Sequence, residues 1–263
     1  MNAASESPII ALVSDFGTRD YFVGAMKGVI LTINRNANVI DITHDIEPQD
    51  IASAGFTLRA CYGEFPPQTI FVAVVDPGVG SDRRALLVET EKYYFLAPDN
   101  GLLGFVFDET ENYCVYELTE ETYFRRPVSR TFHGRDVFAA CAAHLSKGVA
   151  PNSFGGEISD FVLPSENSPR KTNENEIEAQ IIHVDRFGNL ITNLRRAYLP
   201  EKFILKIGAS KIEKLRNFYA EAETDELFMI FGSSEYLEVV AFRNSAAKTL
   251  DVKIGASVRI YKT

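Results

Sequence analysis

The sequence is poor in cysteine, in basic residues and in long apolar runs, and each shortage excludes a class of protein. Three cysteines among 263 residues, Cys61, Cys114 and Cys141, are too few and too widely spaced for a disulfide framework or a CxxC metal site. The 27 basic residues against 36 acidic ones give a net charge of −9, which argues against a nucleic-acid or anionic-membrane partner. A small-molecule partner is the better expectation.

No segment has the pattern of a membrane span or a secretory leader. The segment MNAASESP lacks a basic region followed by an apolar stretch, and apolar runs such as 137–143 are far shorter than a bilayer requires. Together with the pattern of cysteine use, these features predict a cytoplasmic protein with reduced thiols. The 46% hydrophobic content suffices for one large domain or two modest ones.

The first part of the chain, residues 1–162, alternates strand-like and helix-like patterns. Segments 9–14 and 38–43 are rich in β-branched residues, and apolar residues at helical spacing lie between them. Asp20 is a candidate cap for that helix, and a second helical pattern over 50–61 precedes a further apolar strand. This succession predicts an α/β domain with a mostly parallel sheet.

The rest of the chain changes character. Residues 163–176, LPSENSPRKTNENE, have no apolar periodicity and are predicted to be a linker. Over 177–263, short segments of alternating apolar and polar residues follow one another with turn residues between them. They predict a smaller, all-β, barrel-like domain.

Two segments place charged residues where strands should end, which in a parallel sheet is where ligands bind. In SDFGTRD, Asp15 can accept hydrogen bonds from vicinal hydroxyls such as those of a ribose, although a plain turn would use the same residues. In VDPGVGSDRR, a short glycine-containing loop can return Arg83 to Asp76. Such a pair can hold a reactive water, or it can simply close the loop.

Two further segments carry ring and amide side chains. His133 lies at a predicted helix start, where the helix dipole favours the neutral imidazole. The role of His44 stays open, and a metal site formed by His44, Asp45, His133 and Asp136 is a minor alternative because no HExxH or HxH spacing supports it. The segment DRFGNLITN, residues 185–193, can hold an ammonium group and the edge of a base, or can be a β-turn.

Five motifs in order resemble the S-adenosylmethionine hydrolase family, also called S-adenosylmethionine hydroxide adenosyltransferases, which is related to S-adenosylmethionine-dependent fluorinating and chlorinating enzymes. The motifs are SDFGTRDYFVGAMKG, VVDPGVGSDRR, APDNGLL, TFHGRD and VDRFGNLITNL, and they cover nearly the whole chain. The resemblance implies an α/β domain, a barrel-like β domain and a cytoplasmic homotrimer whose sites lie between domains of neighbouring subunits. It also implies hydrolysis of S-adenosylmethionine to adenosine and L-methionine without a cofactor or a metal.

The resemblance assigns roles residue by residue. The water-activating residues of the family fall on Asp76, Arg83 and His133, and its ribose-binding aspartate falls on Asp15. The remaining substrate contacts fall on Phe132, near the sugar, and on Asp185, Phe187, Asn189 and, less closely, Ser233.

Departures from the family pattern and competing functions remain. Ser234 stands where some relatives have arginine, and Glu235 replaces a usual glycine, so the methionine end can differ. A chlorinase-like halogenase is the main alternative, although Asp76, Arg83, His133 and Gly134 favour water as the nucleophile. A metal-dependent hydrolase and a non-catalytic adenosine or S-adenosylmethionine binding protein are the others.

Overall fold

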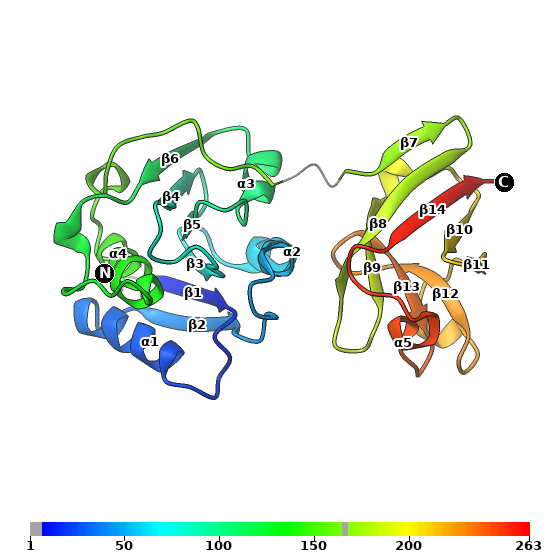
Figure 1. Cartoon of the computed structure of the whole chain (residues 1–263), viewed down its shortest axis with the longest axis horizontal. Helices are drawn as coiled ribbons and strands as arrows, with labels where there is room; N and C mark the ends of the chain where they lie inside the picture. The colour runs from blue at the N-terminus through cyan, green and yellow to red at the C-terminus, as the bar shows by residue number, and fades with distance from the viewer. Residues whose placement is uncertain (1–6, 165–167) are drawn as a thin grey trace, which may run out of the picture. The chain divides into compact units, whose positions relative to one another are not determined.

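The computed structural model describes residues 7–164 and 168–263, and the chain forms two compact units. The first unit spans Met1–Ser165 and the second spans Glu166–Thr263. A six-stranded sheet with helices forms the first unit, and an eight-stranded sheet forms the second (Figure 1). The expectation of an α/β domain followed by an all-β domain is confirmed.

The sheet of the first unit is mixed rather than mostly parallel. In spatial order its strands are β2 (Asn38–Thr43), β1 (Ile9–Ser14), β3 (Ile70–Val74), β5 (Tyr94–Pro98), β4 (Ala85–Thr90) and β6 (Tyr113–Glu117). The first four run parallel, but β4 runs antiparallel to both β5 and β6. Only residues 91–93 join β4 to β5, which are too few for the crossover that a parallel pair needs.

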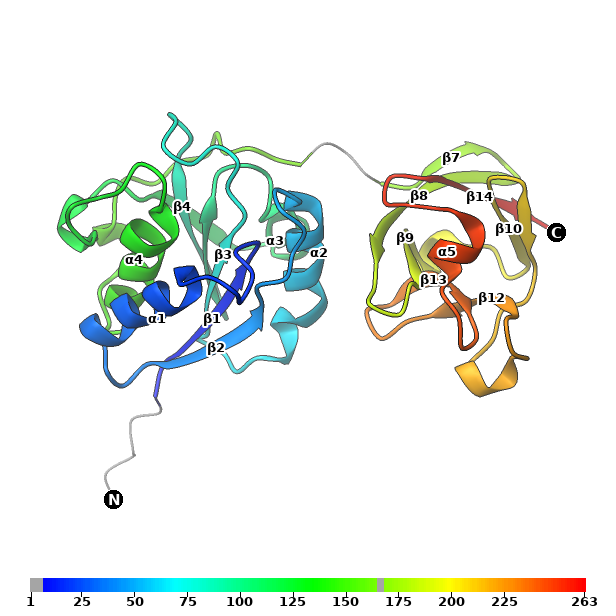
Figure 2. The same cartoon turned by 60° about the horizontal axis from the view of Figure 1, so that its bottom comes forward.

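Helices cover both faces of this sheet (Figure 2). They are α1 (Phe22–Ile33), α2 (Ile51–Cys61), α3 (Gly104–Glu109), a π-helical turn (Gly134–Ala139) and α4 (Ala140–Leu145). On one face, Met26 of α1 packs with Leu12, and the π-helical turn and α4 join the same core. On the other face, α2 and α3 pack against the sheet, where Leu58 meets Phe71. The sheet is buried on both sides, which explains its nearly continuous apolar strands.

The second unit is an antiparallel, barrel-like sheet. Its strands are β7 (Arg170–Asn173), β8 (Glu176–Val184), β9 (Leu190–Arg195), β10 (Phe203–Ile207), β11 (Ser210–Ile212), β12 (Leu227–Phe231), β13 (Tyr236–Ala241) and β14 (Ser257–Lys262), with one short helix, α5 (Ala246–Leu250). The main path runs β11-β10-β14-β8-β9-β13-β12. The larger of its two apolar clusters includes Ile181, Leu205 and Val258.

Part of the segment expected to be a linker is a strand. Strand β7 lies within residues 163–176 and pairs antiparallel with β8. All four of its residues are exposed, so it carries no apolar alternation that the sequence could reveal. Residues 165–167 of the same segment lie outside the described residues.

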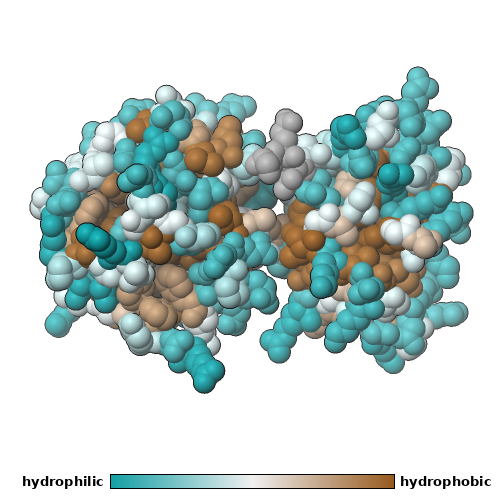
Figure 3. All heavy atoms as spheres, viewed as in Figure 1, coloured by the Kyte–Doolittle hydropathy of each residue, from teal (hydrophilic) through white to brown (hydrophobic). Residues whose placement is uncertain are grey.

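On the face shown in Figure 3, polar side chains dominate the outline of each unit, and apolar patches lie within each outline. In the second unit, Phe187 and Phe218 are among the exposed apolar residues, at 77% and 57%. Within residues 7–164 and 168–263, no helix has the length and apolar character needed to cross a membrane.

The two sequential helices α1 and α2 begin differently. Asp50 caps α2, because its Oδ1 accepts the backbone N–H of Ser53 at 2.9 Å. Helix α1 starts after Tyr21 with no side-chain cap, so the expectation that Asp20 caps it is wrong. The reason is local: the residue that precedes the helix is Tyr21, which moves Asp20 one position outside the cap.

We therefore expect Asp50→Ala to lower the free energy of unfolding by about 1 kcal/mol, the usual cost of losing an N-cap. Asp20→Ala is the matched control and should change it by less than about 0.5 kcal/mol, as at exposed sites without a structural role. Urea titrations followed by circular dichroism measure both values. Equal effects of the two substitutions would contradict the cap assignment.

Candidate active site

The carboxyl ends of neighbouring parallel strands bring the expected residues of the first unit to one edge of the sheet. Register places Ser14 of β1 beside Val74 of β3, so Asp15 and Asp76 follow adjacent strand ends. Asn100, which follows β5, donates its side-chain amide to the carbonyl oxygen of Val75 at 2.9 Å. This bond fixes the chain immediately before Asp76. The sequence motif around Asn100 therefore supports the strand end on which Asp76 lies.

Asp76, Arg83 and His133 form one hydrogen-bonded group. The Arg83 guanidinium donates from Nε to both Asp76 oxygens, at 2.8 and 3.0 Å, and its Nη2 makes a further contact with Oδ2. The same Nη2 lies 3.1 Å from Nδ1 of His133. The side chains of Asp76 and Arg83 are 6% and 11% exposed. The short loop thus returns Arg83 to Asp76, where the Arg83 guanidinium also contacts His133.

Glycine closes this loop against the segment that carries His133. Gly80 has a φ of +80°, and a Cβ there would lie 2.3 Å from the carbonyl oxygen of Arg130. Among the amino acids, only glycine adopts this backbone conformation readily and has no Cβ to collide with that carbonyl oxygen. The loop between Asp76 and Arg83 is therefore packed against the chain just before His133.

The contact with Arg83 decides how His133 holds its proton. A guanidinium can only donate, so Nδ1 of His133 accepts and the neutral ring carries its proton on Nε2. Burial and the positive charge of Arg83 lower the pKa of His133, while Asp76 and Asp136 oppose the shift. The imidazole is therefore neutral near pH 7, with Nε2–H available to an oxygen of a ligand.

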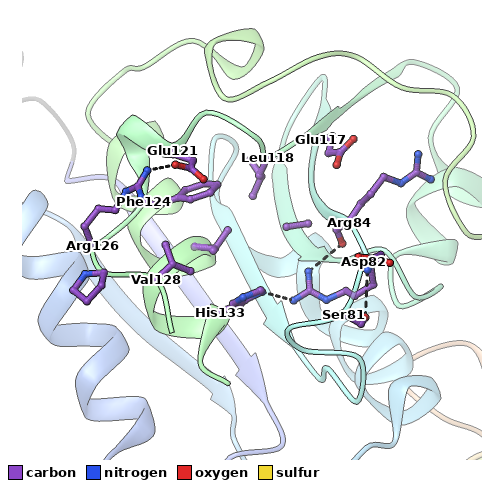
Figure 4. Close-up of a pocket in the computed structure, with 14 residues that line it drawn as sticks. Ser81, Asp82, Arg84, Glu117, Leu118, Glu121, Phe124, Arg126, Val128 and His133 are labelled. Carbon is purple, nitrogen blue, oxygen red and sulfur yellow. Dashed lines mark hydrogen bonds and ion pairs between the residues drawn. The ribbon is translucent and has the colours of Figure 1, made fainter. Parts of the chain in front are cut away.

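A cavity of about 720 Å³ opens beside this group. Arg83 and His133 line it together with apolar side chains that include Leu118, Phe124 and Val128. Figure 4 shows the imidazole of His133 directed toward the guanidinium, with Arg126 and Glu121 paired on the other side of the cavity. The volume is within the range of small-molecule sites.

The two arginines of the loop have different partners. Arg84 binds Asp99 at 2.9 Å and Asp160 at 2.7 Å, and Asp99 in turn accepts the backbone N–H of Val162. These contacts attach the 160–162 segment to the end of β5. Arg84 therefore stabilises the fold, whereas Arg83 makes the contacts with Asp76 and His133.

Asp15 and Phe132 are linked through Phe16. The Oδ2 atom of Asp15 accepts the backbone N–H of Gln49 at 2.9 Å, so part of its carboxylate is used by the neighbouring loop. Phe132 is 6% exposed and packs edge-on against Phe16, with ring centroids 5.9 Å apart. A Cβ on Gly134 would lie 3.2 Å from the Phe16 ring, so Gly134 gives this aromatic cluster its space.

His44, whose role the sequence left open, fixes the loop that carries Asp15. Its Nδ1 lies 2.7 Å from Ser14 Oγ, and its Nε2 lies 3.0 Å from Asp41 Oδ1. The backbone oxygen of His44 also accepts the N–H of Gly17 at 2.7 Å. The contacts with Ser14 and Gly17 hold the chain on either side of Asp15, and the contact with Asp41 orients the His44 ring. Because Ser14 is fully buried, this row of side chains is structural rather than nucleophilic.

The residues considered for a metal site are engaged elsewhere. His44 is bound as described, and Asp136 is fully buried, accepts the N–H of Ser129 and pairs with Arg135 and Arg125. Across the two described stretches of the chain, no group of three or more His, Cys, Asp or Glu side chains is placed to hold a metal ion. The four-residue metal alternative is therefore not assembled.

In the second unit, the 185–189 turn is closed by Asp185. Its carboxylate accepts the backbone N–H groups of Phe187 and Asn189 and the side-chain amide of Asn189, at 2.8 to 2.9 Å. Asn189 is buried and Phe187 is exposed. Ser233 is exposed in the turn between β12 and β13, and the β9–β13 register places that turn at the opposite end of β13. The register therefore places Asp185 and Ser233 near opposite ends of β13.

Two family models match the two units. Residues 10–155 match the SAM hydroxide adenosyltransferase N-terminal domain, and residues 179–259 match the SAM hydroxide adenosyltransferase C-terminal domain. The chain belongs to the SAM hydroxide adenosyltransferase family. This membership confirms the resemblance that the five sequence motifs indicated.

Members of this family, and related fluorinases, are similar to this chain over most of its length. An (R)-S-adenosyl-L-methionine hydrolase of Methanocaldococcus jannaschii is 37% identical, covering 93% of this chain and 92% of the relative. A fluorinase of Actinoplanes sp. is 28% identical and covers 75% of each. A crystal structure of an uncharacterized conserved protein from Thermotoga maritima superposes with a TM-score of 0.89 at 32% identity, covering 96% of this chain and all of that one.

The contact between Arg83 and His133 predicts how the pKa of His133 responds to substitution of Arg83 in this SAM hydroxide adenosyltransferase. Arg83→Gln should raise the pKa of His133, because it removes a positive charge beside the ring and leaves the negative charge of Asp76 unopposed. NMR titration of the four histidine rings measures it. Arg84→Gln is the control and should leave His133 unchanged. A wild-type His133 titrating above the ordinary value of about 6.5 would contradict the proton placement.

Proposed function

We propose that this chain hydrolyses S-adenosyl-L-methionine to adenosine and L-methionine. The observation that carries the proposal is the contact of Asp76, Arg83 and His133 beside an open cavity. Family membership and the hydrolase name of the M. jannaschii relative support the same substrate. A positioned carboxylate and a neutral imidazole are the groups that orient a water molecule.

In the proposed step, the oxygen of water attacks C5′ of the ribose. The C5′–S bond breaks, its electron pair returns to sulfur, and methionine leaves as a neutral thioether. No acid is needed at sulfur, because the sulfonium is already a good leaving group. Asp76 accepts the proton of the water, since Nδ1 of His133 is occupied by Arg83 and Nε2 carries a proton. His133 orients the water oxygen through Nε2–H.

Arg83 fixes the geometry of the proposed step. Its guanidinium binds both oxygens of Asp76 and one nitrogen of His133. In a site from which bulk water is excluded, such pre-positioned charges act without reorganisation at the moment of reaction. We assign ribose binding to Asp15, whose Oδ1 has no hydrogen bond to residues 7–164 or 168–263. Phe132 supports Phe16 beside it.

The remaining expectations belong to the same proposal. We propose that Asp185, Phe187, Asn189 and Ser233 contribute contacts for adenine and methionine, and that the enzyme acts as a cytoplasmic homotrimer with sites shared between subunits. Mixing inactive Asp76→Ala and Asp185→Ala subunits tests the sharing, because exchange should restore part of the activity. We further propose that the reaction needs neither a metal nor another cofactor, so extensive dialysis against a chelator should leave turnover intact.

Substitution of the three water-positioning residues tests the proposed chemistry. Asp76→Ala, Arg83→Ala and His133→Ala should each lower kcat by about 10²-fold or more, with a smaller change in KM, because the lost interactions act on the nucleophile. Chromatographic measurement of adenosine release gives both constants. Arg84→Ala is the matched control and should retain most of its turnover. Near-normal turnover in all three variants would refute the assignment.

A further inference from the structure

The segment that carries His133 is a loop closed on itself by one buried carboxylate. Asp136 lies in the π-helical turn that follows His133 and is fully buried. Its Oδ2 accepts the backbone N–H of Ser129 at 2.8 Å, and its own carbonyl oxygen accepts the backbone N–H of Arg125 at 2.8 Å. These two bonds join the beginning of segment 125–136 to its end. His133 therefore belongs to a loop whose ends cannot move apart without breaking both bonds.

Two arginines pair with this carboxylate. Arg135 donates from Nε to Oδ1 at 2.7 Å and from Nη2 to Oδ2 at 2.8 Å, and Arg125 donates from Nη1 to Oδ1 at 3.1 Å. The Arg135 guanidinium also lies over the ring of Phe132, 4.9 Å from its centroid. Burial alone would raise the pKa of Asp136, but its bonds to Arg135 and to the Ser129 N–H outweigh burial and hold that pKa below its usual range. The carboxylate is therefore ionised at neutral pH.

The closed loop meets the water-positioning residues at two points. The carbonyl oxygen of Arg130 lies where a Cβ on Gly80 would be only 2.3 Å away, so the loop packs against the one that carries Arg83. Val128 and His133 of the same loop both line the cavity (Figure 4). The shape of the loop thus sets the 3.1 Å contact between His133 Nδ1 and Arg83 Nη2, and a hydrogen bond of that length tolerates little displacement.

We propose that Asp136 is a positioning residue: by holding the 125–136 loop closed, it sets the place of the His133 imidazole relative to Arg83 and thereby to the attacking water. This inference rests on the proposed function, which supplies the water and the carbon that it attacks. Asp136 is fully buried, so it acts through His133 rather than by touching substrate. Small errors in the position of such a group are costly to a reaction.

Substitution of Asp136 in the full-length protein tests this role. Asp136→Asn keeps an oxygen for the Ser129 N–H but loses the charge that pairs with both arginines, whereas Asp136→Ala loses every contact of the carboxylate. We expect kcat for adenosine release to fall by about fivefold or more in Asp136→Asn and further in Asp136→Ala, with a smaller change in KM. Near-normal kcat in a folded Asp136→Ala variant would overturn the inference.

A double-mutant cycle shows whether Asp136 acts through His133, and it needs only the milder variant. Adding Asp136→Asn to His133→Ala should change kcat by less than about twofold, because the side chain that Asp136 positions is already gone. A general structural role predicts the same proportional loss of kcat with and without His133. Equal losses in the two backgrounds would therefore overturn the inference.

NMR titration of His133 gives a readout that does not depend on turnover. The charged groups that act on its ring are Arg83, Asp76 and Asp136, and the rise in the His133 pKa on Arg83→Gln reports how close the guanidinium lies to the ring. That rise should be smaller when both proteins also carry Asp136→Asn, because the loosened loop no longer holds the ring against Arg83. A rise of the same size would overturn the inference.

Asp99→Asn is the matched control. Asp99 is also a buried aspartate that accepts the backbone N–H of a loop residue, Val162, and pairs with an arginine, Arg84. Its substitution should lower the free energy of unfolding, measured by urea titration, and leave kcat within about twofold of wild type. A loss of kcat equal to that of Asp136→Asn would overturn the inference, since any buried aspartate of the unit would then have the same effect.

The inference and the proposed function fail separately. A wild type that hydrolyses S-adenosylmethionine, with independent effects of Asp136→Asn and His133→Ala, would refute the role of Asp136 and leave hydrolysis standing. A wild type that releases no adenosine would refute hydrolysis. In that case a smaller response of the His133 pKa in the NMR comparison would still support the placement of His133 by Asp136.

Discussion

The guanidinium of Arg83 is the constraint on which the rest of the candidate site depends. It binds both oxygens of Asp76 and donates to His133, so one side chain sets the position of a carboxylate and the tautomer of an imidazole. Because a guanidinium stays protonated at any ordinary pH, this arrangement is fixed before substrate arrives. The proposed division of labour follows from it: Asp76 receives a proton and His133 donates a hydrogen bond.

Much of the first unit serves to hold that guanidinium in place. Parallel strands deliver Asp15 and Asp76 to one edge, Asn100 fixes the chain before Asp76, and Gly80 lets the returning loop lie against the segment before His133. His44 stabilises the neighbouring loop through Ser14. None of these supporting residues needs to touch substrate. They limit the freedom of the residues that do, which is where much of the catalytic benefit of a folded site arises.

Local patterns in the sequence predicted the two-domain organisation and the return of Arg83 to Asp76, because strand ends and short glycine loops follow from such patterns. The grouping of both residues with His133 was predicted from the family resemblance. The sequence did not predict the antiparallel β4, because the alternation of strands and helices in the first 75 residues was extended to the rest of the sheet, whereas β4 and β5 are joined by residues 91–93 alone. It missed β7, which is exposed throughout, and the support given by Asn100.

The central claim is that water, positioned by Asp76 and His133 through Arg83, attacks C5′ of S-adenosylmethionine. The most direct measurement is product analysis by mass spectrometry after reaction in ¹⁸O-labelled water, with and without chloride. The account predicts adenosine carrying ¹⁸O in its 5′-hydroxyl group, together with unlabelled methionine, in both conditions. Formation of 5′-chloro-5′-deoxyadenosine in chloride, or adenosine without the label, would contradict it.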